Sequence, residues 1–393
     1  MTSTALATDI RPSVQVTRVT DSEADSVAEF MRRAWGSTVT GERIRRSLRE
    51  GARTNPAVTG EPIPSVVYCR DDEALGYLGS IPVRFWNGRS EVTAHWLKGF
   101  MVLPEHQNGP IGFGLLREML RHVDVAGTMT VAQPARRLFQ AVGFTDCGAL
   151  PNYIAVLRGA RVAQSVDVDA LGDAVPSIVR RGVTLARKTG VASVGGAWAS
   201  IGRRSLNALR TVSLTTSVDL SGSLPPQDAL DRLWLRARQR VVAGAARDGR
   251  YFHWRYDARR GGTYEVAAVR ERGARARLVG VAVVRRSGDS SDPRLKGLRL
   301  ATLADVLFDP RDERAGMAAL KGAERLARRM GADALLCTTA HPAITRLLAR
   351  RLYLKTSGGV HMMVREPRAE RRLSTSVEDW WLMRGDANSD DAF

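Results

Sequence analysis

The chain has 393 residues, of which 44% are hydrophobic and 25% are charged. This composition is typical of a folded globular protein and excludes disordered and collagen-like chains. The length favours two domains of roughly 150 residues each. The formal net charge of +18 comes mainly from scattered arginines. We interpret it as a generally basic surface, because no recognisable nucleic-acid-binding motif accompanies it.

The cysteines and the N-terminus indicate the compartment. Cys69, Cys147 and Cys337 are far apart in the sequence and form neither a disulfide framework nor a Cys-x-x-Cys pair. The histidines lack metal-binding spacing, so no metal site is expected. Residues 1–13 lack the segments of a secretory signal and are interpreted as a disordered lead-in. Together these features predict a cytoplasmic protein.

The first half of the chain has the pattern of a domain that mixes strands and helices. Apolar and polar residues alternate over 14–19, and Val27, Phe30, Met31 and Trp35 recur at helical spacing. We predict strands at 14–19, 65–69, 74–86, 90–103, 128–131 and 152–157, and helices at 21–35, around 44–48 and at 134–142.

Residues 96–120 are the most informative stretch. Apolar residues end a strand, turn-forming residues follow at 108–114, and apolar residues then recur at helical spacing. The start of a helix presents unpaired N–H groups and the positive end of the helix dipole, and glycines let an anion approach the backbone. The stretch therefore predicts a phosphate-binding turn.

Residues 159–226 are predicted to form a basic helical connector. Their uncharged run at 189–202 is shorter than the roughly 20 apolar residues of a membrane-spanning helix. A connector packed between domains is the favoured interpretation, and peripheral contact with an anionic membrane surface is the alternative.

The second half repeats the order of the first. Pro104 and Pro310 each follow a central strand, and Pro134 and Pro342 each open a later helix. We predict helices at 228–242, 314–330 and 342–351, strands at 264–269, 278–285, 298–308 and 334–338, and an aromatic segment at 251–256. An internal duplication explains this repetition. The fold class is therefore α+β, with two tandem domains that each hold a mixed, mostly antiparallel sheet flanked by helices.

The turn after the central strand carries a family resemblance. Residues 102–112, Val-Leu-Pro-Glu-His-Gln-Asn-Gly-Pro-Ile-Gly, are similar to the motif of the GCN5-related N-acetyltransferase (GNAT) superfamily, in which Gln or Arg is followed by x-x-Gly-x-(Gly or Ala). Gln107 and Gly112 match the first and last positions. Pro110 replaces the inner glycine and lacks an N–H group. Phe139 stands where many members have a tyrosine that protonates the coenzyme A thiolate.

This resemblance covers residues 14–158 and 227–366, which we predict to be an N-terminal GNAT-like domain and a degenerate C-terminal one, followed by a tail at 367–393. The layout resembles tandem acetyltransferase-like proteins of bacterial polysaccharide clusters. It implies transfer of an acetyl group from acetyl-CoA, as a substrate, to an amine on an amino sugar or cell-envelope precursor. The residues implied in acetyl-CoA binding are Met101, Val102, Leu103, Gln107, Asn108, Gly109, Ile111, Gly112, Phe113 and Gly114.

Catalytic side chains are harder to predict, because in this superfamily the amine attacks the thioester directly and the protein mainly positions the reactants. Asp305 and His95 are candidates for proton transfer, with hydrogen-bonded structural side chains as the alternative. The aromatic segment 251–256 either lines an acceptor pocket or fills a core.

Two other functions remain open. An aminoacyl-tRNA-dependent transferase of the peptidoglycan-bridging type fits the basic charge. A non-catalytic tandem GNAT-like binding protein fits Pro110, Phe139, Glu313 and Leu352, which depart from the family pattern. In the tail, Trp380 and Trp381 are expected to dock on a domain and the acidic residues after them to be disordered.

Overall fold

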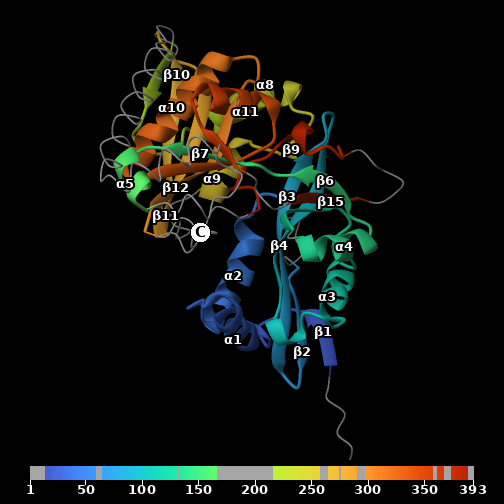
Figure 1. Cartoon of the computed structure of the whole chain (residues 1–393). Coiled ribbons are helices and arrows are strands. Elements are labelled where there is room, and N and C mark those ends of the chain that lie inside the picture. Colours follow the sequence, from blue (N-terminus) through green and yellow to red (C-terminus); the bar gives the residue numbers. More distant parts are fainter. Residues whose placement is uncertain are drawn as a thin grey trace, which may run out of the picture.

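The computed structural model describes residues 14–58, 64–131, 133–165, 216–256, 264–273, 276–289, 297–356, 361–366 and 373–387. They form two mixed sheets with flanking helices, one below the other in Figure 1. This arrangement confirms the predicted α+β class and the tandem layout. We call the sheet that contains β3 and β4, with its helices, the first domain, and the sheet that contains β11 and β12, with its helices, the second domain.

The first domain follows the predicted order of elements as far as α4, and the strand after it, β6, was not predicted. Helix α1 ends at Gly36, whose left-handed conformation (φ 63°) a glycine adopts without strain. Figure 1 shows α1 and α2 on one side of the first sheet and α3 and α4 on the other. The elements are β1 Val14–Arg18, α1 Ala24–Trp35, α2 Gly41–Thr54, β2 Val66–Arg70, β3 Glu73–Trp86, β4 Glu91–Val102, η1 Pro104–His106, α3 Ile111–Met119, β5 Ala126–Val131, α4 Gln133–Ala141 and β6 Thr145–Ala149.

The rest of the chain builds the second domain and returns to the first. The aromatic segment forms helix α9, and its neighbour α8 ends before the predicted boundary at residue 242. The elements are β7 Asn152–Val156, α5 Gly159–Ser165, β8 Thr216–Asp219, α8 Gln227–Ala237, η3 Arg238–Arg240, β9 Ala243–Ala245, α9 Gly249–Tyr256, β10 Tyr264–Glu271, β11 Leu278–Asp289, β12 Arg299–Phe308, α10 Glu313–Arg329, β13 Ala334–Thr338, α11 Pro342–Arg350, β14 Leu354–Thr356, β15 His361–Arg365, η6 Val377–Asp379 and β16 Trp380–Trp381.

The two domains exchange strands. The first sheet has the order β1-β2-β3-β4-β5-β15-β6, and the second has the order β14-β7-β13-β12-β11-β10-β8. Strand β15, from the C-terminal half, lies between β5 and β6, and β7, from the N-terminal half, lies between β13 and β14. Residues 152–157 were predicted in the first domain, whereas β7 pairs with the second sheet. Alternation of apolar residues predicts a strand but does not identify its partner.

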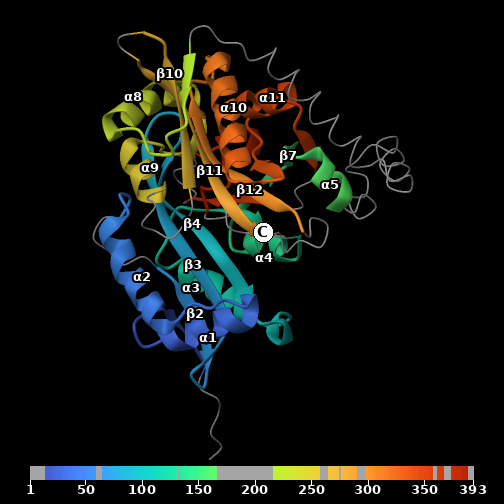
Figure 2. The same cartoon turned by 90° about the vertical axis from the view of Figure 1, so that its left-hand side faces the viewer.

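Each sheet packs its helices through an apolar core. Figure 2 shows α10 lying along the second sheet, and this helix is buried over most of its length. A third cluster anchors the tail to the first sheet, because Trp380 packs against Phe85 and Trp96, with ring centroids 5.2 and 6.3 Å apart. Trp380 and Trp381 are both fully buried, as expected for docking. Asp386, which we expected in a disordered acidic end, is instead buried in an ion pair with Arg247.

Most of the predicted connector, residues 166–215, lies outside the described residues. Within the part of the chain that the structure describes, no helix combines the length and apolarity needed to span a membrane. The described residues also contain no group of three or more His, Cys, Asp or Glu side chains arranged to hold a metal ion.

Candidate functional site

The central strand of the first domain separates from its parallel neighbour. Among the described residues, β4 pairs with β5 at His95–Ala126 and Trp96–Gly127, although β4 continues to Val102. A register shift between β3 and β4 accompanies the separation, and Gly99 has a φ of 63° there. In the described part of the chain the two strands are therefore unpaired beyond Trp96, and we call this separation at the carboxyl end of β4 the strand opening. Ligands bind at the carboxyl ends of strands in many sheets with parallel strands.

Helix α3 begins next to this opening, and its start has no cap. Pro110 is the N-cap residue and offers no side-chain acceptor. The first helical hydrogen bond runs from the Gly114 N–H group to the Pro110 carbonyl oxygen, at 3.0 Å. The N–H groups of Ile111, Gly112 and Phe113 donate to no acceptor among the described residues. Three adjacent donors and the positive end of the helix dipole are therefore available to an anion.

The predicted glycines and Gln107 have different local roles. A Cβ atom on Gly112 would lie 3.0 Å from Leu138 Cδ2 and 3.1 Å from Phe100 Cζ, so a larger residue must displace its neighbours. A Cβ on Gly114 would meet nothing closer than 3.6 Å. The Gln107 side-chain amide donates to the Val102 carbonyl oxygen at 3.1 Å, which ties the turn back to the end of β4.

Aromatic rings pack behind the turn. Phe100 at the end of β4 makes an edge contact with Phe139 of α4, and Phe139 makes another with Phe144, with centroid distances of 5.4 and 5.1 Å. Phe139 is buried and has no hydroxyl group, so this position supplies no proton to a leaving thiolate.

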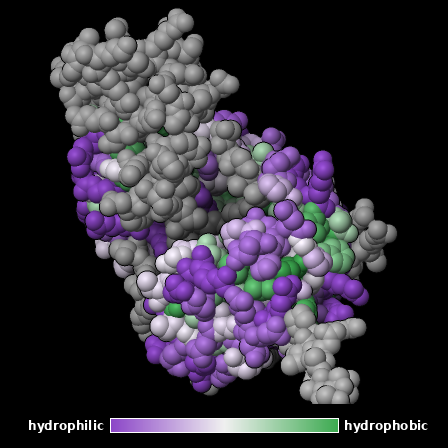
Figure 3. All heavy atoms as spheres, turned by 60° about the horizontal axis from the view of Figure 1, so that its bottom comes forward, coloured by the Kyte–Doolittle hydropathy of each residue, from purple (hydrophilic) through white to green (hydrophobic). Residues whose placement is uncertain are grey.

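One exposed aromatic residue lies beside the opening. Trp35, at the end of α1, belongs to the helical spacing that predicted this helix, and its side chain is 43% exposed. Its ring lies 3.5 Å from the position that a Gly99 Cβ would take, which places it at the register shift in β4. Figure 3, which brings this end of the molecule forward, shows apolar side chains exposed within a largely hydrophilic face.

The candidate His95 lies on β4, upstream of the register shift. The Ser80 hydroxyl donates to the Pro64 carbonyl oxygen at 2.7 Å, so Ser80 Oγ accepts the proton of His95 Nδ1 at 3.1 Å. This assignment leaves Nε2 as the unprotonated nitrogen. Burial lowers the pKa of His95 to about 4, so the imidazole is neutral at pH 7 and weakly basic.

The equivalent helix start in the second domain is capped. Asp312 is the N-cap residue of α10, and its carboxylate accepts the Ala315 N–H group at 2.9 Å. Glu313 follows at the first helical position and forms ion pairs with Arg346 and Arg350. Negative charge and an occupied donor make this helix start unfavourable for a phosphate group. The Asp-Glu sequence before an amphipathic helix is an N-cap signal that is visible in the sequence.

The protein's own tail occupies the strand opening of the second domain. Among the described residues, β12 pairs with β13 from Leu300–Ala334 to Thr302–Leu336. Further along β12, the Ala304 carbonyl oxygen accepts the Gly385 N–H group at 2.8 Å, and the Val306 carbonyl oxygen accepts Trp381 Nε1–H at 2.9 Å. The Trp381 ring also packs against His341, at the start of α11, with centroids 4.7 Å apart. The tail thus fills the space between the end of β12 and α11.

Asp305 is sealed beneath this tail. Its carboxylate accepts hydrogen bonds from Arg247 Nε and Tyr256 Oη, both at 2.9 Å. The side chains of Asp305 and Arg247 are both fully buried. Arg247 also donates to Asp386 at 2.5 Å, and Tyr251 Oη contacts Asp386 at 3.4 Å. Burial, partly offset by the charge of Arg247, raises the pKa of Asp386 to about 6. This geometry favours a structural role for Asp305.

The aromatic segment belongs to the same core. Phe252 and Tyr256 are buried, and Trp254 packs against the core at partial exposure. Arg247 and Gly385, which also belong to this network, could not be predicted as functional or structural residues, because their partners are distant in the chain.

The architecture consists of two GNAT folds in tandem, which are joined by an exchange of strands. Solved structures confirm the predicted resemblance at the level of the fold. The chain is similar over 98% of its length to N-myristoyltransferase from Saccharomyces cerevisiae with bound myristoyl-CoA, of which 92% is covered, at 11% identity and a TM-score of 0.56.

Two further structures show the same fold. A tandem GNAT protein from the clavulanic acid biosynthesis pathway matches 90% of this chain and 98% of its own, at 14% identity and a TM-score of 0.51. A probable N-acyltransferase from Enterococcus faecalis V583 matches 90% of this chain and 73% of its own, at 9% identity and a TM-score of 0.52. No protein-family model matches the sequence, and no curated protein matches it significantly.

Proposed function

We propose that this chain is an acyl-CoA-dependent N-acyltransferase whose first domain binds acetyl-CoA and transfers the acetyl group to an amine. The observation that carries the proposal is the uncapped start of α3 beside the opening at the end of β4. The N–H groups of Ile111, Gly112 and Phe113 suit the pyrophosphate of coenzyme A. A small acceptor, such as an amino sugar or a cell-envelope precursor, is part of the proposal and rests on the family resemblance.

The fit between the turn and a pyrophosphate is local and physical. The turn is held by hydrogen bonds from His106 N–H to Leu103 O at 2.8 Å and from Gly109 N–H to His106 O at 3.2 Å, in addition to the Gln107 side chain. Its donors are therefore fixed in place before a ligand arrives, and little ordering is needed on binding. The equivalent helix start in the second domain, that of α10, lacks this set of free donors, because Asp312 caps it.

In the proposed reaction, the amine nitrogen attacks the thioester carbonyl carbon, a C–N bond forms and the C–S bond breaks. The nitrogen loses a proton and the departing thiolate gains one. Phe139 cannot donate that proton, and the buried Asp305 carboxylate is already held by Arg247 and Tyr256. His95 Nε2 is weakly basic, so it suits orientation of a donor better than removal of a proton. The protein's main contribution is to hold the two reactants together.

A non-catalytic binding protein is the second candidate, and Phe139 favours it because no acid stands in its place. Both candidates require acyl-CoA binding, so turnover separates them. Coenzyme A release in the presence of a panel of amines is expected for the enzyme, and saturable binding without release for the binder. An aminoacyl-tRNA-dependent transferase would instead bind no acetyl-CoA.

Isothermal titration calorimetry with acetyl-CoA tests the proposal directly. We expect saturable binding with one site per chain, because the tail fills the opening of the second domain. Two sites per chain would contradict the assignment to the first domain alone. The absence of binding at high micromolar acetyl-CoA would reject the proposed function.

A further inference from the structure

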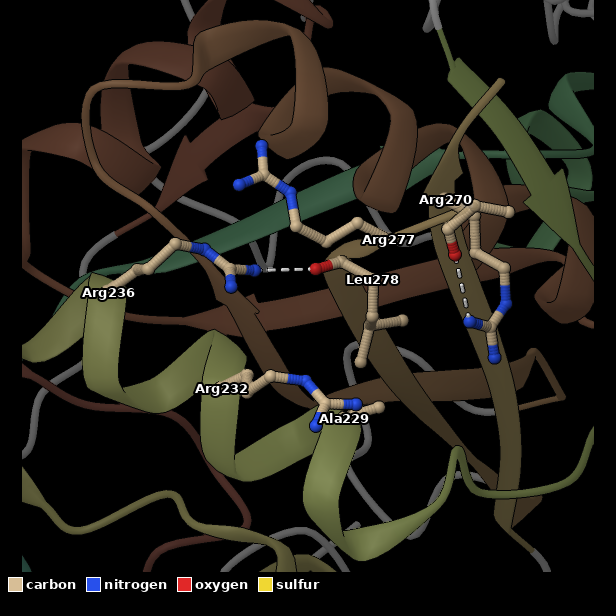
Figure 4. A pocket seen from close by; sticks show the side chains of 7 residues that line it. Ala229, Arg232, Arg236, Arg270, Arg277 and Leu278 are labelled. Carbon is tan, nitrogen blue, oxygen red and sulfur yellow. Dashed lines mark hydrogen bonds between the residues drawn. The ribbon is translucent and has the colours of Figure 1, made fainter. Parts of the chain in front are cut away.

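A pocket lined by arginines lies in the second domain, apart from the β12–β13 opening. Its volume is about 300 Å³. Helix α8 contributes Arg232 and Arg236, which are four residues apart and therefore share one face of the helix. Figure 4 shows these side chains reaching towards Leu278, with Arg270 and Arg277 coming from the β10–β11 hairpin. The lining residues are Ala229, Arg232, Arg236, Arg270, Ala276, Arg277 and Leu278.

Backbone contacts hold two of the guanidinium groups in place. Arg236 donates to the Leu278 carbonyl oxygen at 2.6 Å, and Arg270 donates to the Ala276 carbonyl oxygen at 3.3 Å, as Figure 4 shows. Ala229 and Leu278 are buried and belong to the core of the second domain, so they give the pocket a rigid apolar wall. The arginine side chains are thus presented by packed elements on both sides.

The positive charge of the pocket is only partly neutralised. Arg232 pairs with Asp228 at 2.6 Å, and Arg277 pairs with Glu271 at 2.5 Å, both on exposed parts of the surface. Within the described part of the chain, neither Arg236 nor Arg270 has a carboxylate partner in an ion pair. Among the described residues, two of the four arginines are therefore without a directly paired carboxylate.

The charged form of Arg236 is disfavoured by burial and by its position among the other arginines of the pocket. Burial lowers the pKa of Arg236, and the positive charges of Arg277 and Arg232 lower it further. The carboxylates of Asp309 and Glu271 act in the opposite direction without forming a hydrogen bond to it. Asp312, on the loop that holds Asp309, acts on Arg277 in the same way. An anion bound among these guanidinium groups would relieve the repulsion between them.

We propose that this pocket binds a small molecule through a phosphate or pyrophosphate group. Guanidinium groups hold phosphate oxygens through two parallel hydrogen bonds, and a phosphate can neutralise two charges where a carboxylate neutralises one. The pocket is at the lower end of the size range of small-molecule sites, which suits a compact phosphorylated ligand. The site is distinct from the start of α3 in the first domain.

Calorimetry at constant ionic strength, with inorganic pyrophosphate as the probe, tests the proposal. We compare the native protein with the double variant Arg236→Gln, Arg270→Gln and with the control Arg46→Gln, which changes an exposed arginine on α2. The double variant is expected to bind pyrophosphate at least about tenfold more weakly, because charge-assisted hydrogen bonds are lost. The control is expected to bind as the native protein does.

A second variant and a competing ligand test whether pyrophosphate binds in the arginine pocket and not at the proposed acetyl-CoA site. Arg277→Glu reverses an exposed charge without removing the half-buried Arg236, and it is also expected to weaken pyrophosphate binding about tenfold or more. Saturating acetyl-CoA should leave pyrophosphate binding in the native protein, because the two ligands occupy different domains. Unchanged affinity in both variants, complete displacement by acetyl-CoA, or no saturable binding of pyrophosphate would overturn the proposal.

Discussion

Replacing Pro110 with aspartate should close the start of α3 to anions. The equivalent helix of the second domain already has such a cap, because the Asp312 carboxylate accepts a hydrogen bond from the Ala315 N–H group at 2.9 Å. Pro110 holds the same N-cap position in α3 and offers no acceptor. An aspartate at 110 can accept a free N–H group of the first turn and place negative charge where the pyrophosphate is proposed to bind.

The expected effects have opposite signs for stability and for binding. An aspartate N-cap stabilises a helix by roughly 0.5–2 kcal/mol relative to a residue without a capping side chain. At about 5 Å from a phosphate charge, a carboxylate repels it by about 3 kcal/mol in a medium of effective dielectric constant near 20. Since this site is partly exposed, we expect about half of that repulsion, which weakens acetyl-CoA binding roughly tenfold.

Pro110→Asn is the matched control, because asparagine is an equally good N-cap without the charge. Acetyl-CoA affinity is measured by calorimetry, and stability by chemical denaturation. We expect both variants to be at least as stable as the native protein and Pro110→Asp to bind acetyl-CoA clearly more weakly than Pro110→Asn.

If Pro110→Asp binds acetyl-CoA with native affinity while it remains folded, then the pyrophosphate does not lie at this helix start. The reasoning from the uncapped N–H groups would then be refuted, whatever the protein's activity.

Three further predictions concern glycines and a buried acid. Gly112→Val should cost about 1–3 kcal/mol of stability through overpacking and weaken acetyl-CoA binding, whereas Gly114→Ala, which meets no close contact, should preserve both in the same calorimetry and denaturation assays. Gly385→Ala places a Cβ atom 2.3 Å from Tyr256 Oη, so the tail must move; we expect an unfolding midpoint several degrees lower in calorimetric scans, and an unchanged midpoint would contradict the close packing. Because the pKa of Asp386 is raised to about 6 in the folded chain, its contribution to stability is largest in acid, falls as pH rises from about 4 to 6 and is flat above. Asp386→Asn should remove this part of the pH dependence, at most about 3 kcal/mol, when denaturation curves at pH 4.5 and 7 are compared with those of the native protein.

Local signals predicted the elements of the first domain well. An Asn-Gly pair is typical of a tight hairpin turn, and Asn87-Gly88 stands between β3 and β4, where Gly88 has the positive φ of 86° that such turns require. The same holds for the turn before α3, where Pro110 and the glycines define the helix start from residues that are adjacent in sequence. These features depend on a few neighbouring residues, so the sequence contains what is needed to find them.

The remaining features depend on partners far away in the chain. Arg247 bonds to Asp305 and Asp386, which are 58 and 139 residues distant, and nothing around Arg247 in the sequence distinguishes it from a surface arginine. The partners of β7 and β15 are equally non-local. The tail fills the strand opening of the second domain because Gly385 packs closely against Tyr256 and Ala304. A periodic pattern in the sequence does not predict such a contact.

The exchange of β7 and β15 affects how the chain folds during its synthesis. During synthesis the first sheet lacks β15 until residues 361–365 have left the ribosome, so the edges of β5 and β6 that later pair with it stay open while the whole second half is translated. An N-terminal fragment that ends before β15 would expose those edges permanently. Fragments of the two halves, expressed separately, should therefore aggregate alone and become soluble only when they are produced together in one cell.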